Sequence, residues 1–349
     1  MQYRQLGRTG LRVSAFTLGT MGFGGTGWAT PVGTIDVDGA REEIAIAKEA
    51  GVNLIDTADV YSAGLAEEII GQALGRDRED WLIATKARMP MGEGPNDAGL
   101  SRHHIIRGAE ASLRRLGTDY IDLYQVHEWD GHTPVEETLT ALDDLVRSGK
   151  VRYVGCSNYA AWQMMKALAA SDARGLERFA SNQLYYSLQA RDIEAEIVPA
   201  CLDQGVGILV WSPIAGGLLS GKYRRGVAAP AGSRHLSDWD EPPVHDEDKL
   251  YDTIEVAVKI GESHGVSAAR VSLAYIAQKP GVTSVIVGAR TPSQLRDNLA
   301  AADLELTPDE IQSLDDVSGE PLRYPFWHQA KTSSDRLSAA DLSQISRHL

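Results

Sequence analysis

The chain has few cysteines, no long apolar run and no basic cluster, and each of these shortages excludes a class of protein. Its 349 residues include only two cysteines, Cys156 and Cys201, which supply neither a disulfide framework nor the ligand spacing of a zinc site. No run of about 18 apolar residues occurs, so we expect no membrane-spanning helix. No cluster of lysine and arginine occurs, and the net charge is −14. Neither nucleic acid nor an anionic membrane surface is therefore an expected partner.

The same shortages bear on the compartment and on cofactor binding. The segment from Met1 to Arg4 lacks the apolar core of a secretion signal. Together with the few cysteines, this predicts a reducing, cytoplasmic location. Because the chain is acidic, an anionic cofactor would have to be held by local cations and backbone N–H groups. The sequence gives no indication of the oligomeric state.

What the chain does contain is a regular alternation of short apolar runs and amphipathic helical stretches. Runs of this kind are typical of strands in a parallel sheet that is covered on both faces. Helix signals stand between them, with a serine at the start of one stretch and a glycine after its end. Clear helical stretches are Asp38–Ala50, Ser101–Leu116 and Pro134–Ser148. The predicted strands are Ala15–Leu18, Asn53–Asp56, Leu82–Lys86, Ile121–His127, Val151–Ser157, Phe179–Gln183, Gly207–Ser212 and Ser284–Val287.

Eight strands with a helix after nearly every one predict a single (β/α)8 barrel, a TIM barrel with parallel strands, spanning residues 1–349. A doubly wound open sheet is the alternative, and periodicity alone does not exclude it. Three additions are expected. Tyr3–Val13 would form a hairpin that closes the bottom of the barrel, and residues 221–249 would form a long, lid-like loop. Residues 320–349 would form a C-terminal tail with extra helices.

Polar residues stand at the carboxyl ends of successive predicted strands. Asp56 ends the second strand, Lys86 the third and His127 the fourth. In a barrel these ends form one ring, where enzymes of this architecture place their active sites. Each residue also has an ordinary explanation: Asp56 as a helix cap, Lys86 as a surface lysine and His127 as a core histidine. Their shared position on three successive strands favours a site. Further members of the ring are Ser157, Asn158, Gln183, Trp211, Ser212, Gly288 and Arg290.

These residue types suit the reduction of a carbonyl group. An aspartate can balance a buried lysine, and a cation beside Tyr61 would lower the pKa of its phenol from about 10. Tyr61 would then be a proton donor or acceptor near neutral pH. A neutral His127 could hydrogen-bond the carbonyl oxygen of the substrate. The group lacks a hydride source, which a nicotinamide cofactor would provide.

Several segments resemble the aldo-keto reductase family in order, from about Tyr3 to Val317. They are GVNLIDTADVY at residues 51–61, LYQVH at 123–127, GCSNY at 155–159 and WSPIAGG at 211–217. The resemblance implies a (β/α)8 barrel that uses NADPH to reduce an aldehyde or ketone. It also implies a catalytic tetrad of Asp56, Tyr61, Lys86 and His127, with Tyr61 as the general acid.

The resemblance further implies where the cofactor binds. Thr20 and Met21 would approach the nicotinamide riboside, while Asp56, Ser157, Asn158 and Gln183 would surround the nicotinamide amide and Trp211 would stack on the ring. The pyrophosphate side would be held by Ser212, Pro213, Ile214, Ala215, Gly216, Lys222 and Arg234. The adenosine site would comprise Gly288, Arg290, Gln294, Asp297 and Asn298. Arg290 favours NADPH, through the 2′-phosphate, over NADH.

Two rival functions differ in class. Potassium-channel β subunits resemble this family and bind the cofactor while acting on a partner membrane protein. They depart from the pattern at the position of His127, which this chain keeps, so a working reductase is favoured. A structural barrel with a dead site would leave the tetrad unexplained.

The remaining features are a glycine-rich segment that only looks like a dinucleotide-binding motif, and aromatic residues that would contact the substrate. The segment from Gly22 to Gly27 (GFGGTG) has the letters of a dinucleotide-binding fingerprint, but the residues after it do not begin a helix, as that motif requires. We interpret it as a loop over the site. Trp28 and Trp129, with Tyr61 and His127, would line the substrate pocket, and Phe326–Trp327 are further candidates. The predicted substrate is a medium-sized aldehyde or ketone.

Overall fold

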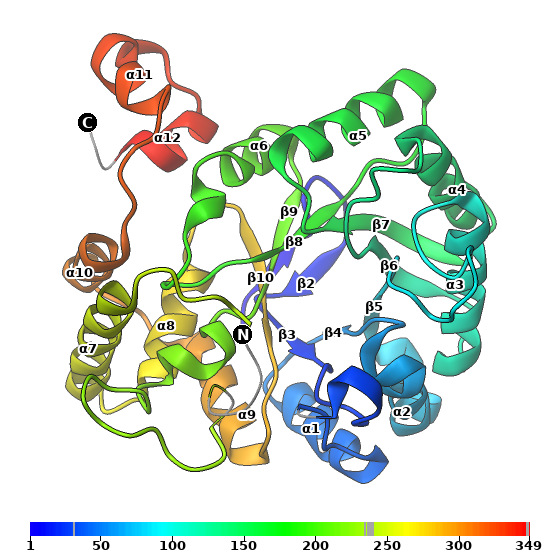
Figure 1. The fold of residues 1–349 in the computed structure, drawn as a ribbon, viewed down its shortest axis with the longest axis horizontal. Helices are drawn as coiled ribbons and strands as arrows, with labels where there is room; N and C mark the ends of the chain where they lie inside the picture. The colour runs from blue at the N-terminus through cyan, green and yellow to red at the C-terminus, as the bar shows by residue number, and fades with distance from the viewer. Residues whose placement is uncertain (31, 234, 236–240, 347–348) are drawn as a thin grey trace.

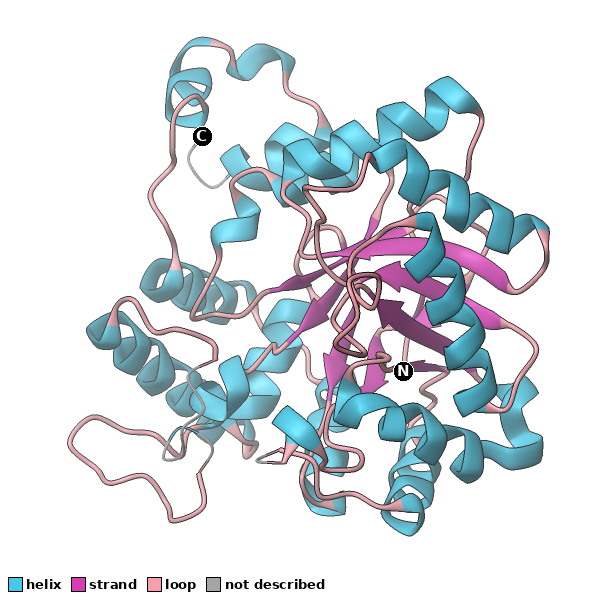
Figure 2. Cartoon of the chain, turned by 45° about the vertical axis from the view of Figure 1, so that its right-hand side comes forward, coloured by secondary structure: helices cyan, strands magenta, loops and turns pink. Residues whose placement is uncertain are grey.

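In a computed structural model of the chain, eight parallel strands join into a closed barrel surrounded by helices (Figure 1, Figure 2). The structure describes residues 1–30, 32–233, 235, 241–346 and 349. The predicted (β/α)8 barrel is confirmed, and the open sheet is excluded because the first and last barrel strands pair with each other. In order around the barrel, the strands are β3 (Phe16–Gly19), β4 (Leu54–Asp56), β5 (Leu82–Ala87), β6 (Ile121–Val126), β7 (Val151–Ser157), β8 (Ser181–Tyr185), β9 (Gly207–Trp211) and β10 (Val282–Val287).

An N-terminal hairpin lies at the amino end of the barrel, as predicted. Its strands, β1 (Tyr3–Gln5) and β2 (Arg12–Ser14), pair antiparallel. Gly7 in its turn has no room for a side chain, because a Cβ there would lie 2.5 Å from the carbonyl oxygens of Ala180 and Gly205. The hairpin and the barrel strands share one buried apolar cluster, which plugs this end. Its members are Leu6, Val13, Leu54, Ala84, Leu123, Ala180, Leu209 and Ile286.

The helices begin and end at capping residues that the sequence provides. Ser101 accepts a hydrogen bond from the His104 N–H at the start of α3, and Gly117 ends that helix with a φ of +63°. None of the described helices is both long and apolar enough to cross a membrane. The helices are α1 (Val37–Glu49), α2 (Leu65–Leu74), α3 (Arg102–Leu116), α4 (Val135–Arg147), α5 (Ala161–Arg174), α6 (Ile197–Gln204), α7 (Glu247–His264), α8 (Ala268–Ala277), α9 (Pro292–Leu299), α10 (Pro308–Ser318), α11 (Phe326–Thr332) and α12 (Ala339–Ile345).

The structure corrects the predicted bounds of two strands by two residues each, and those of one loop. Strand β10 begins at Val282 rather than at Ser284. Strand β8 begins two residues later than predicted, so Gln183 lies inside the strand rather than at its end. The long loop ends earlier than predicted, because Asp246 caps α7 and the helix begins at Glu247. Outside the barrel, α11 lies beside α12 at the periphery (Figure 1). This placement makes Phe326 and Trp327 wrong as candidates for the pocket wall.

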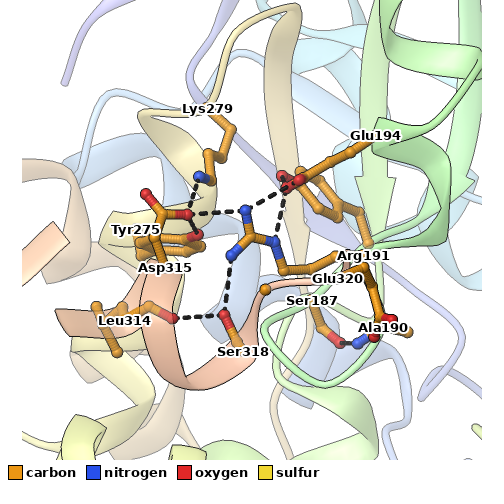
Figure 3. Close-up of polar contacts among 12 residues, drawn as sticks. Ser187, Ala190, Arg191, Glu194, Tyr275, Lys279, Leu314, Asp315, Ser318 and Glu320 are labelled. Atoms are coloured by element: carbon orange, nitrogen blue, oxygen red, sulfur yellow. Dashed lines mark hydrogen bonds and ion pairs between the residues drawn. The ribbon is translucent and has the colours of Figure 1, made fainter. Parts of the chain in front are cut away.

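A buried ionic cluster fastens the segment after β8 to helices α8 and α10 (Figure 3). The Arg191 side chain is 2% exposed and contacts two carboxylates, with Nε 2.8 Å from Glu194 and Nη2 2.7 Å from Asp315. Lys279 Nζ lies 2.8 Å from the same Asp315 oxygen, and Arg191 Nη1 donates to Ser318 Oγ. Two cations and two anions therefore balance one another in the interior, as a buried charge requires.

Candidate active site

A layer of polar side chains lies one step above the apolar plug inside the barrel. Side chains two residues apart on a strand point to the same face. Leu54, Ala84, Leu123 and Leu209 belong to the plug. Two residues further along the same strands lie the side chains that form the floor of the site: Asp56, Lys86, Gln125 and Trp211.

Asp56 and Lys86 form a buried ion pair on neighbouring strands. Lys86 Nζ lies 2.6 Å from Asp56 Oδ1, and the lysine side chain is fully buried. The other aspartate oxygen accepts from Gln183 Nε2 at 2.7 Å and from Gln125 Nε2 at 3.4 Å. Burial alone would lower the pKa of Lys86, but Asp56 and Tyr61 outweigh it and raise that pKa. Lys86 is therefore protonated near neutral pH.

Tyr61 lies directly against this cation. Its hydroxyl is 3.4 Å from Lys86 Nζ, which also lies 5.0 Å from the centre of the tyrosine ring. Burial is the largest influence on the phenol and raises its pKa above the usual value, while Lys86 acts in the opposite direction. The expected net lowering of this pKa is therefore wrong, because burial outweighs the cation. Tyr61 is a protonated phenol with a cation beside it.

The loop that carries Tyr61 is fastened to the glycine-rich segment above the first barrel strand. Ser62 Oγ donates to the Phe23 carbonyl at 2.8 Å and accepts from the Gly25 N–H at 2.9 Å, and Thr26 Oγ1 donates to the Ser62 carbonyl. A three-residue 3-10 helix, Gly27–Ala29, follows the glycines. The structure therefore has no α-helix opening at these residues, and the segment is a loop, as predicted.

His127 follows β6 and faces Tyr61. The two ring centres are 6.1 Å apart at an angle of 76°. Burial, followed by the charges of Lys86 and Arg88, lowers the pKa of His127 to about 3. Its Nδ1 is buried and has no hydrogen-bond partner within the described ranges. The imidazole is thus neutral at physiological pH, as predicted, and can bond a polar ligand.

Strained backbone gathers on the loops around these side chains. In the part of the chain that the structure describes, the non-glycine residues with positive φ all follow β4, β5, β7 or β9 at their carboxyl ends. Such conformations cost free energy and cluster at functional sites. They are Ser62, Ala63, Arg88, Asn158, Ser212 and Ala215.

The residues predicted to hold the nicotinamide gather beside Asp56, and they bond one another. Trp211 Nε1 donates to Asn158 Oδ1 at 2.9 Å, and Ser157 Oγ donates to the Gln183 carbonyl at 3.0 Å. Trp211 stacks on Tyr185, with ring centres 4.9 Å apart. Thr20 is buried, and its hydroxyl donates to the Asp56 carbonyl, while Met21 beside it is part-buried.

The turn after β9 combines positive backbone φ angles with a nearby lysine. Ala215, Gly216 and Gly217 have φ values of +50°, +63° and +100°. The N–H groups of Ala215 and Gly217 donate to the carbonyls of Ser212 and Ile214. A Cβ on Gly217 would lie 3.6 Å from Lys222 Nζ, so the lysine lies over the turn. Ser212 Oγ accepts from the Gly216 N–H. Pro213 and Ile214 complete the turn. Lys222 is therefore the group at this turn that suits the phosphates of a dinucleotide.

The predicted adenosine residues lie around the start of α9, after Gly288. Arg290 is exposed, its N–H donates to Gln294 Oε1, and its Nη1 donates to the Gly232 carbonyl in the long loop. Asn298 Nδ2 donates to the Gly288 carbonyl. Asp297 instead contacts Arg270 and Ser267, so its carboxylate is engaged in the protein. Arg234 lies outside the described residues.

Aromatic rings surround the rim beside β6. Trp129 lies edge-on to Tyr159 at 5.2 Å and to the exposed Trp162 at 5.6 Å. Trp28 belongs to the 3-10 helix Gly27–Ala29. Within the described residues, no group of three or more His, Cys, Asp or Glu side chains could hold a metal ion.

Three polar neighbours of the tetrad were not predicted. Gln125 pairs in register with Lys86 and reaches Asp56, and the i+2 spacing from apolar Leu123 signals its inward direction. The positive charge of Arg88, like that of Lys86, lowers the pKa of His127. Glu128 Oε1 accepts a hydrogen bond from Asn158 Nδ2 at 2.7 Å. The last two lie beyond the strand ends, where the alternation of side chains no longer predicts direction.

Comparison with known proteins agrees with this arrangement. The model of the Aldo/keto reductase family matches residues 15–318. The "Uncharacterized oxidoreductase YrpG" of Bacillus subtilis (strain 168) is 39% identical, over 92% of this chain and 97% of the relative. A "Probable voltage-gated potassium channel subunit beta" of Arabidopsis thaliana is 38% identical, over 91% and 96%. The "Versiconal hemiacetal acetate reductase" of Aspergillus parasiticus is 36% identical, over 90% and 96%. The chain belongs to the aldo/keto reductase family, and it is an oxidoreductase of the carbonyl-reducing kind.

Proposed function

We propose that this chain is an NADPH-dependent reductase of aldehydes or ketones in which Tyr61 is the general acid. The observation that carries the proposal is the position of Lys86 Nζ, 2.6 Å from the Asp56 carboxylate and 3.4 Å from the Tyr61 hydroxyl. NADPH, when bound, supplies the hydride. The protein supplies a proton donor, a cation to stabilise the phenolate left behind, and a carboxylate that holds the cation in place.

Each step of the proton transfer has a residue for it. The neutral His127 ring hydrogen-bonds the carbonyl oxygen and directs it towards Tyr61, whose ring centre is 6.1 Å away. As negative charge develops on that oxygen, the Tyr61 hydroxyl donates its proton. Lys86 stabilises the phenolate that forms, and the high pKa of Tyr61 keeps the donor protonated beforehand. The buried setting strengthens both interactions, because charges attract more strongly where water is excluded.

The cofactor would lie along the carboxyl ends of β7, β8, β9 and β10. Ser157, Asn158, Gln183 and Trp211 would hold the nicotinamide, and Lys222 with the turn at Ala215–Gly216 would hold the pyrophosphate. Arg290 would bind the 2′-phosphate of NADPH. The described parts of the loop between Gly221 and Asp246 would act as a lid, because Arg290 donates to the Gly232 carbonyl and Gln189 donates to the Pro243 carbonyl. Residues 320–349 would be an appended tail on a single barrel domain.

A second candidate is a cofactor-binding subunit that acts on a partner protein. The similarity to the Arabidopsis thaliana channel subunit favours it. The presence of His127 beside Tyr61 favours the reductase.

We also propose a reducing, cytoplasmic compartment. The buried thiols of Cys156 and Cys201, which form no disulfide, are compatible with it.

The decisive experiment combines binding and turnover. NADPH and NADH are titrated into the purified protein by fluorescence, and NADPH oxidation is then followed with a panel of aldehydes and ketones. Tight NADPH binding with turnover supports the reductase. Tight binding without turnover of any panel member favours the binding subunit, and absence of binding to either cofactor contradicts both.

A further inference from the structure

Arg88 is held at the rim of the barrel beside the catalytic group. It follows β5 directly, two residues after Lys86. The His127 N–H donates to the carbonyl of Ala87, and the Gly99 N–H donates to that of Arg88. These bonds fix the backbone on both sides of the residue. Its φ of +155° is rarely adopted by a residue with a side chain, so the surrounding structure imposes the conformation.

The guanidinium of Arg88 has few partners for a group with five N–H donors. Nη2 contacts the Trp129 carbonyl at 3.4 Å, at the long limit for a hydrogen bond. Nε is buried without a partner among the described residues. Within those same ranges, no carboxylate lies within 4.0 Å of it. The terminal nitrogens of this part-buried guanidinium therefore have unused capacity for an anion, because leaving such donors unsatisfied costs free energy.

The positive charge of Arg88 affects the pKa values of two neighbouring side chains, His127 and Glu128. It contributes to the lowered pKa of His127. Burial raises the pKa of the neighbouring Glu128, and the Arg88 charge partly offsets this rise. Glu128 itself binds Asn158 at 2.7 Å rather than Arg88. The carboxylates of Glu128 and Asp130 are therefore engaged elsewhere, Glu128 with Asn158 and Asp130 with the Leu100 N–H and Thr133. Arg88 lies close to His127 and Trp129.

We propose that Arg88 determines substrate specificity by binding an anionic group, and that the preferred substrate is a small aldehyde or ketone that carries a carboxylate. This inference rests on the proposed reductase function. In a chain with a net charge of −14, an acidic substrate gains nothing from the overall field, so a local arginine must supply the attraction. Arginine suits this role because its planar fork can bind a carboxylate through two parallel hydrogen bonds.

The test uses two aldehydes of nearly the same shape, benzaldehyde and para-carboxybenzaldehyde. For each, kcat/KM is measured with NADPH in the wild type, in Arg88→Met and in Arg88→Lys. The wild type is expected to prefer the carboxylated aldehyde. Arg88→Met should reduce the ratio of the two kcat/KM values by about 10- to 100-fold, mainly through KM, and Arg88→Lys should retain part of it. Because each variant gives a ratio, a general loss of activity cancels. Arg41→Met, an exposed arginine on α1, removes the same charge and should leave the ratio unchanged.

Two results would overturn the inference: a wild type without preference for the carboxylated aldehyde, or an unchanged ratio in Arg88→Met. A wild type that oxidises NADPH with neither aldehyde would contradict the proposed function instead. Binding of the corresponding alcohols, para-carboxybenzyl alcohol and benzyl alcohol, separates the two cases by calorimetry. Selective binding of the carboxylated alcohol that is lost in Arg88→Met supports the anion site without any turnover, and equal binding of both alcohols contradicts it.

Discussion

Lys86 Nζ lies 2.6 Å from Asp56 Oδ1, and both side chains are buried beneath the Tyr61 hydroxyl. A buried cation is stable only with a partner, and here the partner leaves the ammonium free to contact the phenol as well. The pair therefore serves the fold and the reaction together. In the proposed mechanism Tyr61 would donate the proton, and Lys86 with Asp56 would hold the charge that follows.

Removal of the Tyr61 hydroxyl should abolish most turnover and leave cofactor binding intact. In Tyr61→Phe the ring remains, so the pocket keeps its shape, but no proton donor faces the carbonyl oxygen. We expect kcat to fall by about 100- to 10,000-fold. NADPH affinity is measured by fluorescence in parallel. Tyr124→Phe is the matched control, because its hydroxyl donates to the Ile105 carbonyl in the helix layer. A near wild-type kcat in Tyr61→Phe would show that another group donates the proton.

Replacement of Lys86 should move the alkaline limb of the reduction profile. Reduction needs the protonated phenol, so the rate falls as pH rises through the pKa of Tyr61. Burial raises that pKa and Lys86 lowers it. In Lys86→Met only the raising influence remains, so the limb should move to higher pH while the maximal rate falls. The profile of kcat/KM against pH measures this. A limb at the wild-type position would mean that Lys86 does not act on the phenol.

His127 should make the protein less stable as the solution becomes acidic. Its pKa is about 3 when folded and about 6.5 when unfolded, so the unfolded chain binds the extra proton between these values. The stability is fully present above pH 6.5 and is lost progressively as pH falls towards 3. Between pH 7 and pH 5 we expect a loss of about 1–2 kcal/mol from this residue. Urea unfolding of wild type and His127→Gln at both pH values tests this, and equal losses in the two proteins would contradict it.

Arg290 should set the preference for NADPH over NADH. The side chain is exposed just before α9, where the proposed binding mode would place the 2′-phosphate. This phosphate is the difference between NADPH and NADH. Arg290→Ala should weaken NADPH binding by about tenfold or more and leave NADH binding nearly unchanged. Arg296→Ala is the control, because that arginine lies on α9, close in sequence to Arg290, and pairs with Glu49 instead. Equal weakening of both cofactors by Arg290→Ala would place the 2′-phosphate elsewhere.

Helices and strands could be predicted where their capping residues or alternation lie within a short segment of sequence. Properties that depend on residues distant in the sequence, such as the burial of a side chain, could not. The caps of α3 at Ser101 and Gly117 stand in the sequence, and so does the alternation that brings Asp56 and Lys86 to one ring. The direction of the Tyr61 pKa was predicted wrongly, because the depth of burial is set by the packing of several loops. Strand β8 was placed two residues early, because Phe179 and Ala180 are apolar and buried like strand residues of the core, whereas the strand itself begins with Ser181, Asn182 and Gln183.

The Arg191 cluster likewise could not be predicted from local sequence patterns. Its partners come from three parts of the chain, so no local pattern indicates it. Burial alone would raise the pKa of Glu194 and of Asp315, but Arg191 and Lys279 hold both below their usual values. The stabilisation is therefore present at neutral pH and is lost as pH falls below about 4, the usual range of carboxyl groups.

Arg191→Met should destabilise the protein by about 3 kcal/mol at pH 7, because it leaves two part-buried carboxylates with one cation. Arg41→Met is the matched control. That arginine is 55% exposed and pairs with an exposed aspartate on the same helix, so its loss should cost less than about 1 kcal/mol. Urea unfolding at neutral pH compares the two. The cluster fastens α10 to the segment after β8, so a loss as small as that of the control would mean that apolar packing alone holds this helix in place.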